Sequence, residues 1–334
     1  METIRKPSVY IVSTGGTIAS KPVSQTQTTA YSAIDFSADD LIDCIPGIRE
    51  RFNLDAEQIF VVGSSAITDA HLLQLSQRVN ELLEREDIDG IVITHGTDTM
   101  EETAFFLNLT VRSNKPVILT GSMRPTTVLS ADGPLNLLNA IVAAAHPQSV
   151  GKGVMVCTND QLWPARDVMK TSTFRVETFQ CPEHGSLGTI FGSEVLYRYA
   201  PQMPHTLHSQ FDVRGMTSLP RVEIIYTHVS CDDFLFRAAM SSGCDGIVLA
   251  GTGNGSLPIP LREACRTRPE KSPAIVRASR VPGGYVGPSG VVPDDTHRTI
   301  PSCGFSPQKS RILLQLALTQ TTDLDALREI FARY

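Results

Sequence analysis

A Gly-Thr signature occurs twice in this chain, each time directly after a short apolar run with the pattern of a buried strand. The run at 8–13 leads into TGGT at 14–17, and the run at 90–94 leads into HGTD at 95–98. Apolar runs bounded by glycine are typical of strands in parallel sheets. Ligands of open α/β sheets bind beyond the carboxyl ends of such strands. The two motifs therefore predict an active site at one sheet edge, built from hydroxyls and a carboxylate.

The first half of the chain alternates short apolar runs with longer stretches of helical periodicity, which is typical of βαβ units and a parallel sheet. We expect strands at 8–13, 59–62, 90–94, 116–120 and 153–157, and helices at 68–86, 99–112 and 134–146. The same alternation resumes after residue 220, with strands at 222–226, 246–250 and 274–278 and helices at 233–241, 308–319 and 324–334.

Between the two halves, a segment with several prolines lacks a sustained apolar period, which indicates a linker. The sequence thus predicts an α/β protein with a parallel-sheet N-terminal domain at 1–198, a linker at 199–220 and a smaller α/β C-terminal domain at 221–334.

Composition narrows the function classes. The formal net charge is −6 over 334 residues and no long Lys/Arg run occurs, so a small molecule is expected as partner rather than nucleic acid or a membrane. The seven cysteines and eight histidines show no metal-ligand spacing, so no metal is expected. The N-terminal segment lacks the apolar core of a signal peptide, and no run of about 18 apolar residues occurs. We therefore expect a cytoplasmic protein.

Thr17 is the first candidate for chemistry. The two glycines before it permit a tight turn that leaves its hydroxyl accessible. A threonine hydroxyl becomes a nucleophile only when a neighbouring group takes its proton. Alternatively, Thr14 and Thr17 only close a turn. The second signature favours catalysis, because Thr97 and Asp98 can present another hydroxyl beside a carboxylate.

Asp98 could instead be structural, since aspartate is a favourable helix-capping residue. Thr99 and Glu102, however, have the spacing of a capping box and can serve the helix start. We therefore expect Asp98 to face a ligand.

The glycine-rich run GTGNG at 251–255 invites a dinucleotide-binding interpretation, which we reject. Its spacing is GxGxG rather than GxGxxG, and Pro258 and Pro260 are expected to interrupt the helix that would bind the pyrophosphate. We expect instead a loop that offers Asn254 to a neighbouring surface.

Six segments together resemble the bacterial L-asparaginase and glutaminase-asparaginase family, with motifs like those of its type II branch. They are TGGTIA at 14–19, ITHGTDTMEETAFFLNLTV at 93–111, GSMRP at 121–125, SADGPLNL at 130–137, GTGNGSL at 251–257 and SRVP at 279–282. The resemblance covers nearly the whole chain. It implies an amidohydrolase that releases ammonia from the side-chain amide of L-asparagine or a similar substrate, without a metal or organic cofactor.

The resemblance also implies an assembly. Members are homotetramers built as a dimer of close dimers, in which each site lies between the N-terminal domain of one subunit and the C-terminal domain of its partner.

Residue roles follow from matching motifs. Thr17 would be the nucleophile that forms an acyl-enzyme, and Tyr31 would belong to the mobile lid beside it. Lys170, which alone would be interpreted as a surface lysine, would join Thr97 and Asp98 and lower the cost of deprotonating Thr97. The implied substrate-binding positions are Ser64, Ser65, Asp98, Ser122 and Asn254.

Two positions depart from the family pattern, and both concern the substrate α-ammonium group. The family has Gln where this chain has Ser65, and Glu where this chain has Val291. Losing a buried charged partner typically costs several kcal/mol of binding. One hypothesis is therefore a specialised amidase for an amide whose α-nitrogen is acylated, cyclised or absent.

The missing Glu could also be replaced by a nearby acid, Asp294 or Asp295, or the amide specificity could be broader. Two further hypotheses concern the whole chain. It could be a non-catalytic binding protein on this scaffold, or an amidase subunit acting on a protein-bound or tRNA-bound residue.

Overall fold

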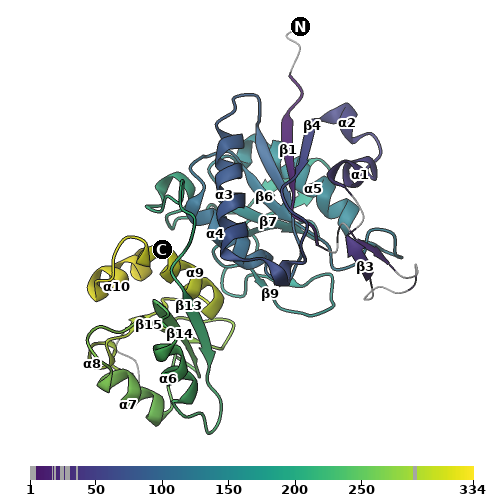
Figure 1. Ribbon diagram of the computed structural model, residues 1–334. Coiled ribbons are helices and arrows are strands. Elements are labelled where there is room, and N and C mark those ends of the chain that lie inside the picture. The colour runs from purple at the N-terminus through teal and green to yellow at the C-terminus, as the bar shows by residue number, and fades with distance from the viewer. Residues whose placement is uncertain are drawn as a thin grey trace. The chain divides into compact units, whose positions relative to one another are not determined.

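The computed structural model describes residues 5–16, 18, 20–22, 26, 31–34, 37–288 and 292–334, with backbone alone at 20–22 and 31–34. It divides into two compact units, Met1–Met216 and Thr217–Tyr334. Each unit has its own sheet and its own helices (Figure 1).

The first unit is built on an eight-stranded sheet in the order β12-β11-β8-β7-β6-β5-β1-β4. Its parallel part comprises β4 (Asn53–Gln58), β1 (Ser8–Ser13), β5 (Gly90–Thr94), β6 (Val117–Thr120) and β7 (Val154–Thr158). The antiparallel part comprises β8 (Gln161–Pro164), β11 (Gly188–Phe191) and β12 (Glu194–Tyr197). The pairing aligns Ser13 with Thr94 and Thr94 with Thr120, so the loops after β1, β5 and β6 start at one edge.

Helices cover both faces of this sheet, as Figure 1 shows. On one face, α5 (Gly133–Ala145), α1 (Ala38–Asp43) and α2 (Ile48–Arg51) share a core with alternate strand residues such as Ile118. On the other, α3 (Asp69–Leu83) and α4 (Met100–Thr110) pack against Val117 and Leu119. Because successive strand residues point to opposite faces, the buried runs are apolar throughout.

The strand predicted at 59–62 is wrong. The strand in this region is β4, and residues 59–62 follow it without regular structure. β4 is an edge strand in which only Leu54 and Ala56 pack against the core, so its sequence is mostly polar. The apolar run after it is only partly buried. The antiparallel strands β8, β11 and β12 and the helices α1 and α2 are also absent from the sequence-based expectation.

Smaller elements complete this unit. The strands β2 (Ser20–Pro22) and β3 (Tyr31–Ile34) form one two-stranded ribbon, and β9 (Met169–Lys170) and β10 (Phe179–Gln180) form another. Short 3-10 turns lie at Ser64–Ala66, Pro147–Ser149 and Thr206–His208. Within the segment 199–220, Phe211 and Val213 are buried, and the boundary between the units falls after Met216.

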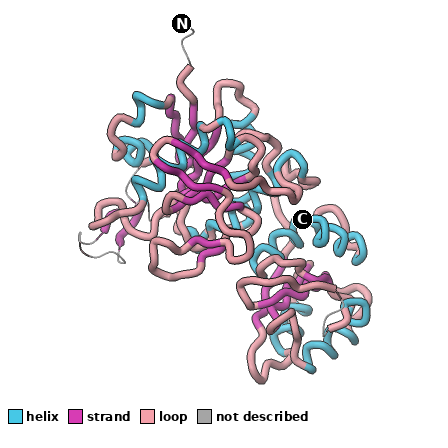
Figure 2. The backbone as a smooth tube through the Cα atoms, turned by 180° about the vertical axis from the view of Figure 1, so that it is seen from behind, coloured by secondary structure: helices cyan, strands magenta, loops and turns pink. Residues whose placement is uncertain are grey.

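The second unit has a parallel sheet in the order β13 (Val222–Tyr226), β14 (Gly246–Gly251), β15 (Ala274–Ser279) and β16 (Ile300–Pro301). Its helices are α6 (Phe234–Ser241), α7 (Ile259–Thr267), α8 (Asp294–His297), α9 (Pro307–Leu318) and α10 (Leu324–Arg333). Figure 2 shows from behind that its strands group together with helices around them. The fold class is therefore the predicted one, two α/β units, with a mostly parallel sheet in the first and a parallel sheet in the second.

The expectation that Pro258 and Pro260 interrupt the helix after GTGNG is wrong. Helix α7 begins at Ile259, with Pro258 at its N-cap and Pro260 in its first turn. Proline is tolerated there because the first backbone N–H groups of a helix have no intrahelical partner.

Candidate active site

Hydrogen bonds tie the carboxyl ends of β1 and β5 together. The backbone N–H and the hydroxyl of Thr14 both donate to the carbonyl oxygen of Thr94, at 3.1 and 2.9 Å. The Thr94 hydroxyl in turn donates to Ser13 Oγ at 3.2 Å. Thr14 therefore closes the sheet edge, which fixes where the two Gly-Thr loops begin.

Glycines let these loops approach each other at backbone distance. Gly16 has φ of +90°, and a Cβ built on it would lie 2.4 Å from the Gly96 nitrogen. A Cβ on Gly96 would lie 2.6 Å from Ser64 Oγ. The loop after β1, the loop after β5 and the turn that carries Ser64 are thus packed so closely that side chains would not fit between them.

Ser64 is an anchor for the segment that follows β5. Its buried hydroxyl accepts the Asp98 backbone N–H at 3.1 Å, and its carbonyl oxygen accepts the Thr99 hydroxyl at 2.8 Å. The capping box expected for Thr99 is therefore wrong. Thr99 occupies the N-cap of α4, but among the described residues no side-chain cap bond forms there, because its hydroxyl is turned to Ser64.

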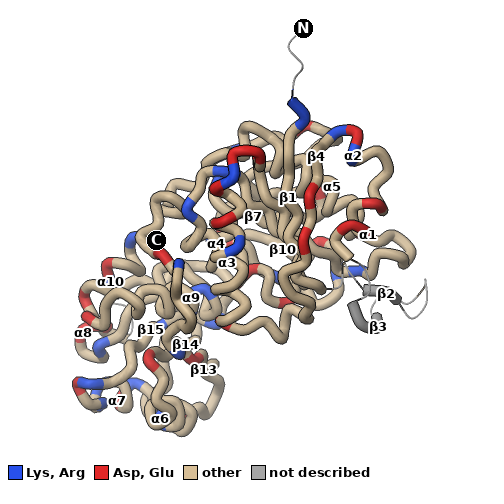
Figure 3. Tube along the Cα trace, turned by 45° about the horizontal axis from the view of Figure 1, so that its top comes forward, with Lys and Arg blue, Asp and Glu red and all other residues tan. Residues whose placement is uncertain are grey.

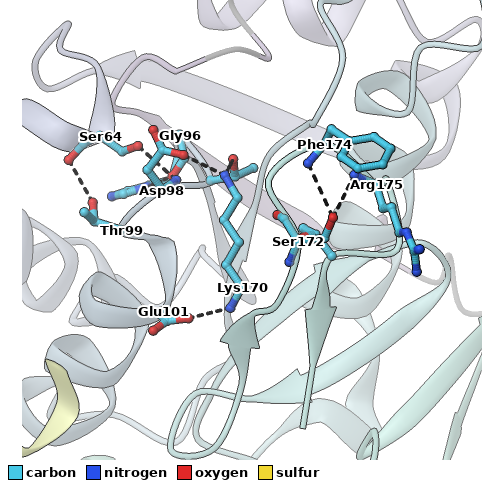
Figure 4. A network of polar contacts seen from close by, with 12 residues as sticks. Ser64, Gly96, Asp98, Thr99, Glu101, Lys170, Ser172, Phe174 and Arg175 are labelled. Carbon is cyan, nitrogen blue, oxygen red and sulfur yellow. Dashed lines mark hydrogen bonds and ion pairs between the residues drawn. The ribbon is translucent and has the colours of Figure 1, made fainter. Parts of the chain in front are cut away.

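Lys170 joins the predicted threonine and aspartate. Its ammonium donates to Thr97 Oγ1 at 2.8 Å. It also donates to Asp98 Oδ1 at 2.6 Å, and Figure 4 shows these two side chains pointing toward one another. Thr97 is buried, and the Lys170 side chain is 16% exposed, whereas that of Asp98 is 61% exposed. An ammonium beside a hydroxyl favours loss of the hydroxyl proton, because the positive charge stabilises the resulting oxyanion. The carboxylate balances that charge on the solvent side.

The loop after β6 is held by two polar side chains of the α5 start. Asp132 accepts the backbone N–H groups of Met123 and Arg124 at 2.9 and 3.0 Å, and Asn136 donates to the Gly121 carbonyl at 3.0 Å. Burial raises the pKa of Asp132. Ser122 lies in this loop, 1% exposed, and its hydroxyl has no hydrogen-bond partner among the residues that the structure describes.

His95 lies at the centre of the second motif and is fully buried. Its Nδ1 lies 2.6 Å from the Gly96 carbonyl oxygen. Burial lowers the pKa of His95 to about 4, so its imidazole is neutral at neutral pH. This histidine therefore supports the loop rather than titrating in the neutral range.

The other predicted residues are exposed, lie in the second unit or fall outside the described part. Thr17 and Val291 are outside the described residues, and only the backbone of Tyr31, in β3, is described. Ser65 is exposed next to Ser64. Asn254 is exposed in the second unit, in the loop after β14.

A buried ion pair organises the loops of the second unit. Arg277, fully buried in β15, donates to both carboxylate oxygens of Asp294 at 2.9 and 2.7 Å. The same guanidinium donates to the carbonyl oxygens of Asn254 and Gly287, at 3.0 and 2.8 Å. It therefore connects the Asn254 loop to the segment that precedes Val291.

This pair bears on which acid could replace the missing Glu. Asp294 is 5% exposed and also accepts the Thr299 hydroxyl, so its carboxylate is engaged inside the unit. Asp295 is 95% exposed and pairs with Arg328 at 2.9 Å. Binding an ammonium through Asp294 would require breaking a buried ion pair.

Within the described ranges, no group of three or more His, Cys, Asp or Glu side chains could hold a metal ion. The helices described are also too short or too polar to cross a membrane.

Two family models match this chain. The model "Asparaginase, N-terminal" matches residues 8–203, and the model "Glutaminase/Asparaginase C-terminal domain" matches residues 221–331. The chain therefore belongs to the asparaginase family, and it is an amidohydrolase of the asparaginase type.

Curated relatives extend over nearly the full length. "Probable L-asparaginase periplasmic" of Haemophilus influenzae is 44% identical over 97% of this chain and 92% of its own. "L-asparaginase 2" of Bacillus subtilis is 43% identical over 98% of this chain and 87% of its own. "Glutaminase-asparaginase" of Pseudomonas fluorescens is 40% identical over 98% of this chain and 90% of its own. The relatives thus include both asparaginases and glutaminase-asparaginases.

Proposed function

We propose that this protein hydrolyses the side-chain amide of L-asparagine or an asparagine- or glutamine-like substrate, with Thr17 as the nucleophile. The observation that carries the proposal is the contact of the Lys170 ammonium with Thr97 and Asp98 at the sheet edge where β1 also ends. The names of the relatives support this substrate class. Thr17 directly follows Gly16, which is packed against Gly96.

The proposed reaction has two halves. Thr17 Oγ attacks the amide carbon, the C–N bond breaks, and ammonia leaves with the hydroxyl proton, giving an ester on Thr17. Water then attacks the ester carbon and passes a proton to the Thr97 hydroxyl beside Lys170, while Thr97 passes its own hydroxyl proton on to Thr17 Oγ. The Thr17 C–O bond breaks as Thr17 Oγ takes this proton, and the acid is released. The Thr97 backbone N–H is the proposed donor to the oxyanion.

Substrate binding is assigned to Ser64, Ser65, Asp98, Ser122 and Asn254, with closure of the lid that carries Tyr31. Ser64 Oγ accepts a hydrogen bond from the Asp98 N–H, so the hydroxyl hydrogen of Ser64 can donate to a substrate carboxylate. Ser122 brings a buried hydroxyl to the end of β6. The exposed Asp98 carboxylate suits a substrate ammonium.

A trapping experiment tests the nucleophile. In the presence of hydroxylamine, an ester on Thr17 is expected to give the hydroxamate of the substrate acid, and mass spectra of the quenched, digested enzyme should show an acyl adduct on the peptide containing Thr17. An adduct on another residue, or hydroxamate formed equally by Thr17→Ala, would contradict this assignment.

The proposed assembly is a homotetramer, a dimer of close dimers in which Asn254 serves a second copy of the chain. Large apolar side chains are exposed where the strands of the second unit end and in the segments that follow them: Tyr226, Val229, Ile259, Val281 and Tyr285. Because apolar patches mark protein interfaces, we propose that these side chains contribute to the contact with a second copy. Sedimentation equilibrium should give a mass of four chains, and a monomer at micromolar concentration would contradict the assembly.

A small-molecule partner and a cytoplasmic location are also proposed. Figure 3 shows positions of Lys and Arg interspersed with positions of Asp and Glu along the trace, and the formal net charge of −6 does not favour nucleic acid as a partner. All seven cysteines lie in the described part and form no disulfide there, which fits a reducing compartment. Cell fractionation tests the location, and recovery in an exported fraction would overturn it.

A narrower specificity is the second candidate, in which the preferred amide has an acylated, cyclised or absent α-nitrogen. It is favoured by the ion pair between Asp294 and Arg277. Asp294 is the acid nearest in sequence to Val291, and because its carboxylate is engaged by Arg277 it cannot replace the family Glu in binding an ammonium group. The kcat/KM for ammonia release from Nα-acetyl-L-asparagine should then exceed that for L-asparagine. The reverse order, with the acetylated amide inert, would refute this specificity.

A further inference from the structure

Glu101 is a buried acid beside this site that takes no part in the proposed reaction. We propose that Glu101 is a positioning residue that holds Lys170 against Thr97 by binding the backbone of Lys170. This inference rests on the proposed function, because it takes the contact between Lys170 and Thr97 as the catalytically useful one.

The geometry shows Lys170 bound at both ends by one segment. Its ammonium donates to Thr97 and Asp98, and its backbone N–H donates to Glu101 Oε2 at 2.5 Å. Figure 4 shows the Lys170 side chain extending from Glu101 at one end to Asp98 at the other. Thr97, Asp98 and Glu101 all lie where β5 passes into α4, whereas Lys170 is 73 residues beyond Thr97 in the chain.

The strand that carries Lys170 is too short to hold it in place, so the contact between its backbone and Glu101 is needed. Strand β9 has two residues and pairs with β10 in a ribbon separate from the main sheet. Short two-stranded ribbons are marginally stable by themselves. The large sheet therefore does not set the position of Lys170, and Glu101 links its backbone directly to α4.

Burial and charge make Glu101 suited to this role. It is 6% exposed and lies in the first turn of α4, where the positive end of the helix dipole favours a carboxylate. Hydrogen bonds to an ionised acceptor are shorter and stronger than neutral ones. A buried carboxylate needs such partners, so its interaction with the Lys170 N–H is hard to exchange for water.

The consequence is kinetic, because a lysine ammonium stands on a flexible four-carbon stem. If the backbone of Lys170 moves, the ammonium no longer meets Thr97 at 2.8 Å. A misplacement of about 1 Å can cost about 100-fold in rate. Figure 4 shows Glu101 at the opposite end of Lys170 from Ser64 and Asp98, so kcat should fall while KM changes little.

Two conservative variants distinguish the effect of the length of the Glu101 side chain from the effect of its charge. Glu101→Gln keeps the length and an acceptor oxygen but loses the charge, whereas Glu101→Asp keeps the charge but is one methylene too short. For Glu101→Asp and Glu101→Ala we expect kcat for ammonia release to fall about 10- to 100-fold at nearly constant KM. Glu101→Gln, which keeps the reach but offers only a neutral acceptor, should recover part of that loss. Glu102→Gln, in the same helical turn, is the matched control.

A double-mutant cycle with Lys170→Met distinguishes positioning from general structural damage. Once the ammonium is gone, Glu101→Asp should lower kcat no further. Equal losses in both backgrounds, or a Glu101→Asp enzyme as fast as wild type, would overturn the inference. If Lys170→Met itself has wild-type kcat, the proposed function of Lys170 is at fault instead.

Discussion

Gly16 and Gly96 lie so close that a Cβ on Gly16 would stand 2.4 Å from the Gly96 nitrogen. Gly16 precedes the proposed nucleophile, and Gly96 precedes the threonine that Lys170 contacts. The contact between two backbones is therefore what brings the two Gly-Thr motifs to one place.

Replacing Gly16 with alanine should destabilise the protein and reduce its activity together. The new methyl group meets backbone rather than a flexible side chain, and φ of +90° is strained for any L residue. We expect a loss of about 2–4 kcal/mol in the free energy of unfolding. Gly63→Ala is the control, since φ there is −64° and a Cβ would meet nothing within 4 Å. Equal unfolding midpoints for both variants would disprove the close contact.

Two adjacent aspartates should differ sharply in their effect on stability. Asp294→Ala leaves the buried Arg277 guanidinium without its carboxylate partner, which costs about 3–5 kcal/mol. Asp295→Ala removes only an exposed pair with Arg328, which is worth about 0–1 kcal/mol. Denaturant unfolding of both variants measures the difference. Similar losses for the two would mean that the Arg277 pair does not hold the second unit together.

Acidification should destabilise the folded protein partly through His95. Burial lowers the pKa of His95 to about 4, below the value near 6.5 expected in the unfolded chain. Between these two values the unfolded state binds a proton that the native state does not, so stability falls as the pH drops through that window. The contribution is about 3 kcal/mol by pH 4. His205, whose pKa burial also lowers, acts in the same direction.

Comparing His95→Gln with wild type isolates this contribution. The variant should show a flatter decline of unfolding free energy between pH 6.5 and 4. Parallel curves would show that His95 is not buried in its neutral form.

Removing the ammonium of Lys170 should affect the rate far more than the fold. Lys170→Met loses the group that polarises Thr97, so we expect kcat to fall about 10²- to 10⁴-fold. Lys271→Met, at an exposed position of the second unit, should leave kcat unchanged. Steady-state ammonia release provides the readout, and circular dichroism checks the fold. Equal kcat for the two variants would remove Lys170 from the mechanism.

The fold class can be predicted from the sequence because it depends on local patterns, and the same patterns locate the two Gly-Thr motifs at strand ends. Buried parallel strands are apolar along their whole length, and the motifs after β1 and β5 mark their carboxyl ends. The sequence does not predict β4, because an edge strand needs few apolar residues. Thr99 has the spacing of a capping residue, but the competing acceptor is Ser64, 35 residues away in the chain.

The contacts of Lys170, Glu101 and Arg277 could not be predicted, because the chain fold brings their partners to them. No local signal marks Lys170, since only the path of β9 past α4 brings it to Thr97. Glu101 lies in the acidic first turn of α4. Because acidic residues are favourable at any helix N-terminus, the sequence does not indicate its second role. Arg277 stands in an apolar strand, and its partner lies 17 residues further along, so their pairing becomes visible only in the structure.

Catalysis by Thr17 is tested by steady-state ammonia release from wild-type enzyme and Thr17→Ala, measured with L-asparagine, L-glutamine and their Nα-acetyl forms. We predict saturable release from at least one of these amides by wild type, and a loss of at least about 1,000-fold in Thr17→Ala. Undiminished release by Thr17→Ala, or no release by the wild-type enzyme from any of the four amides, would contradict this prediction.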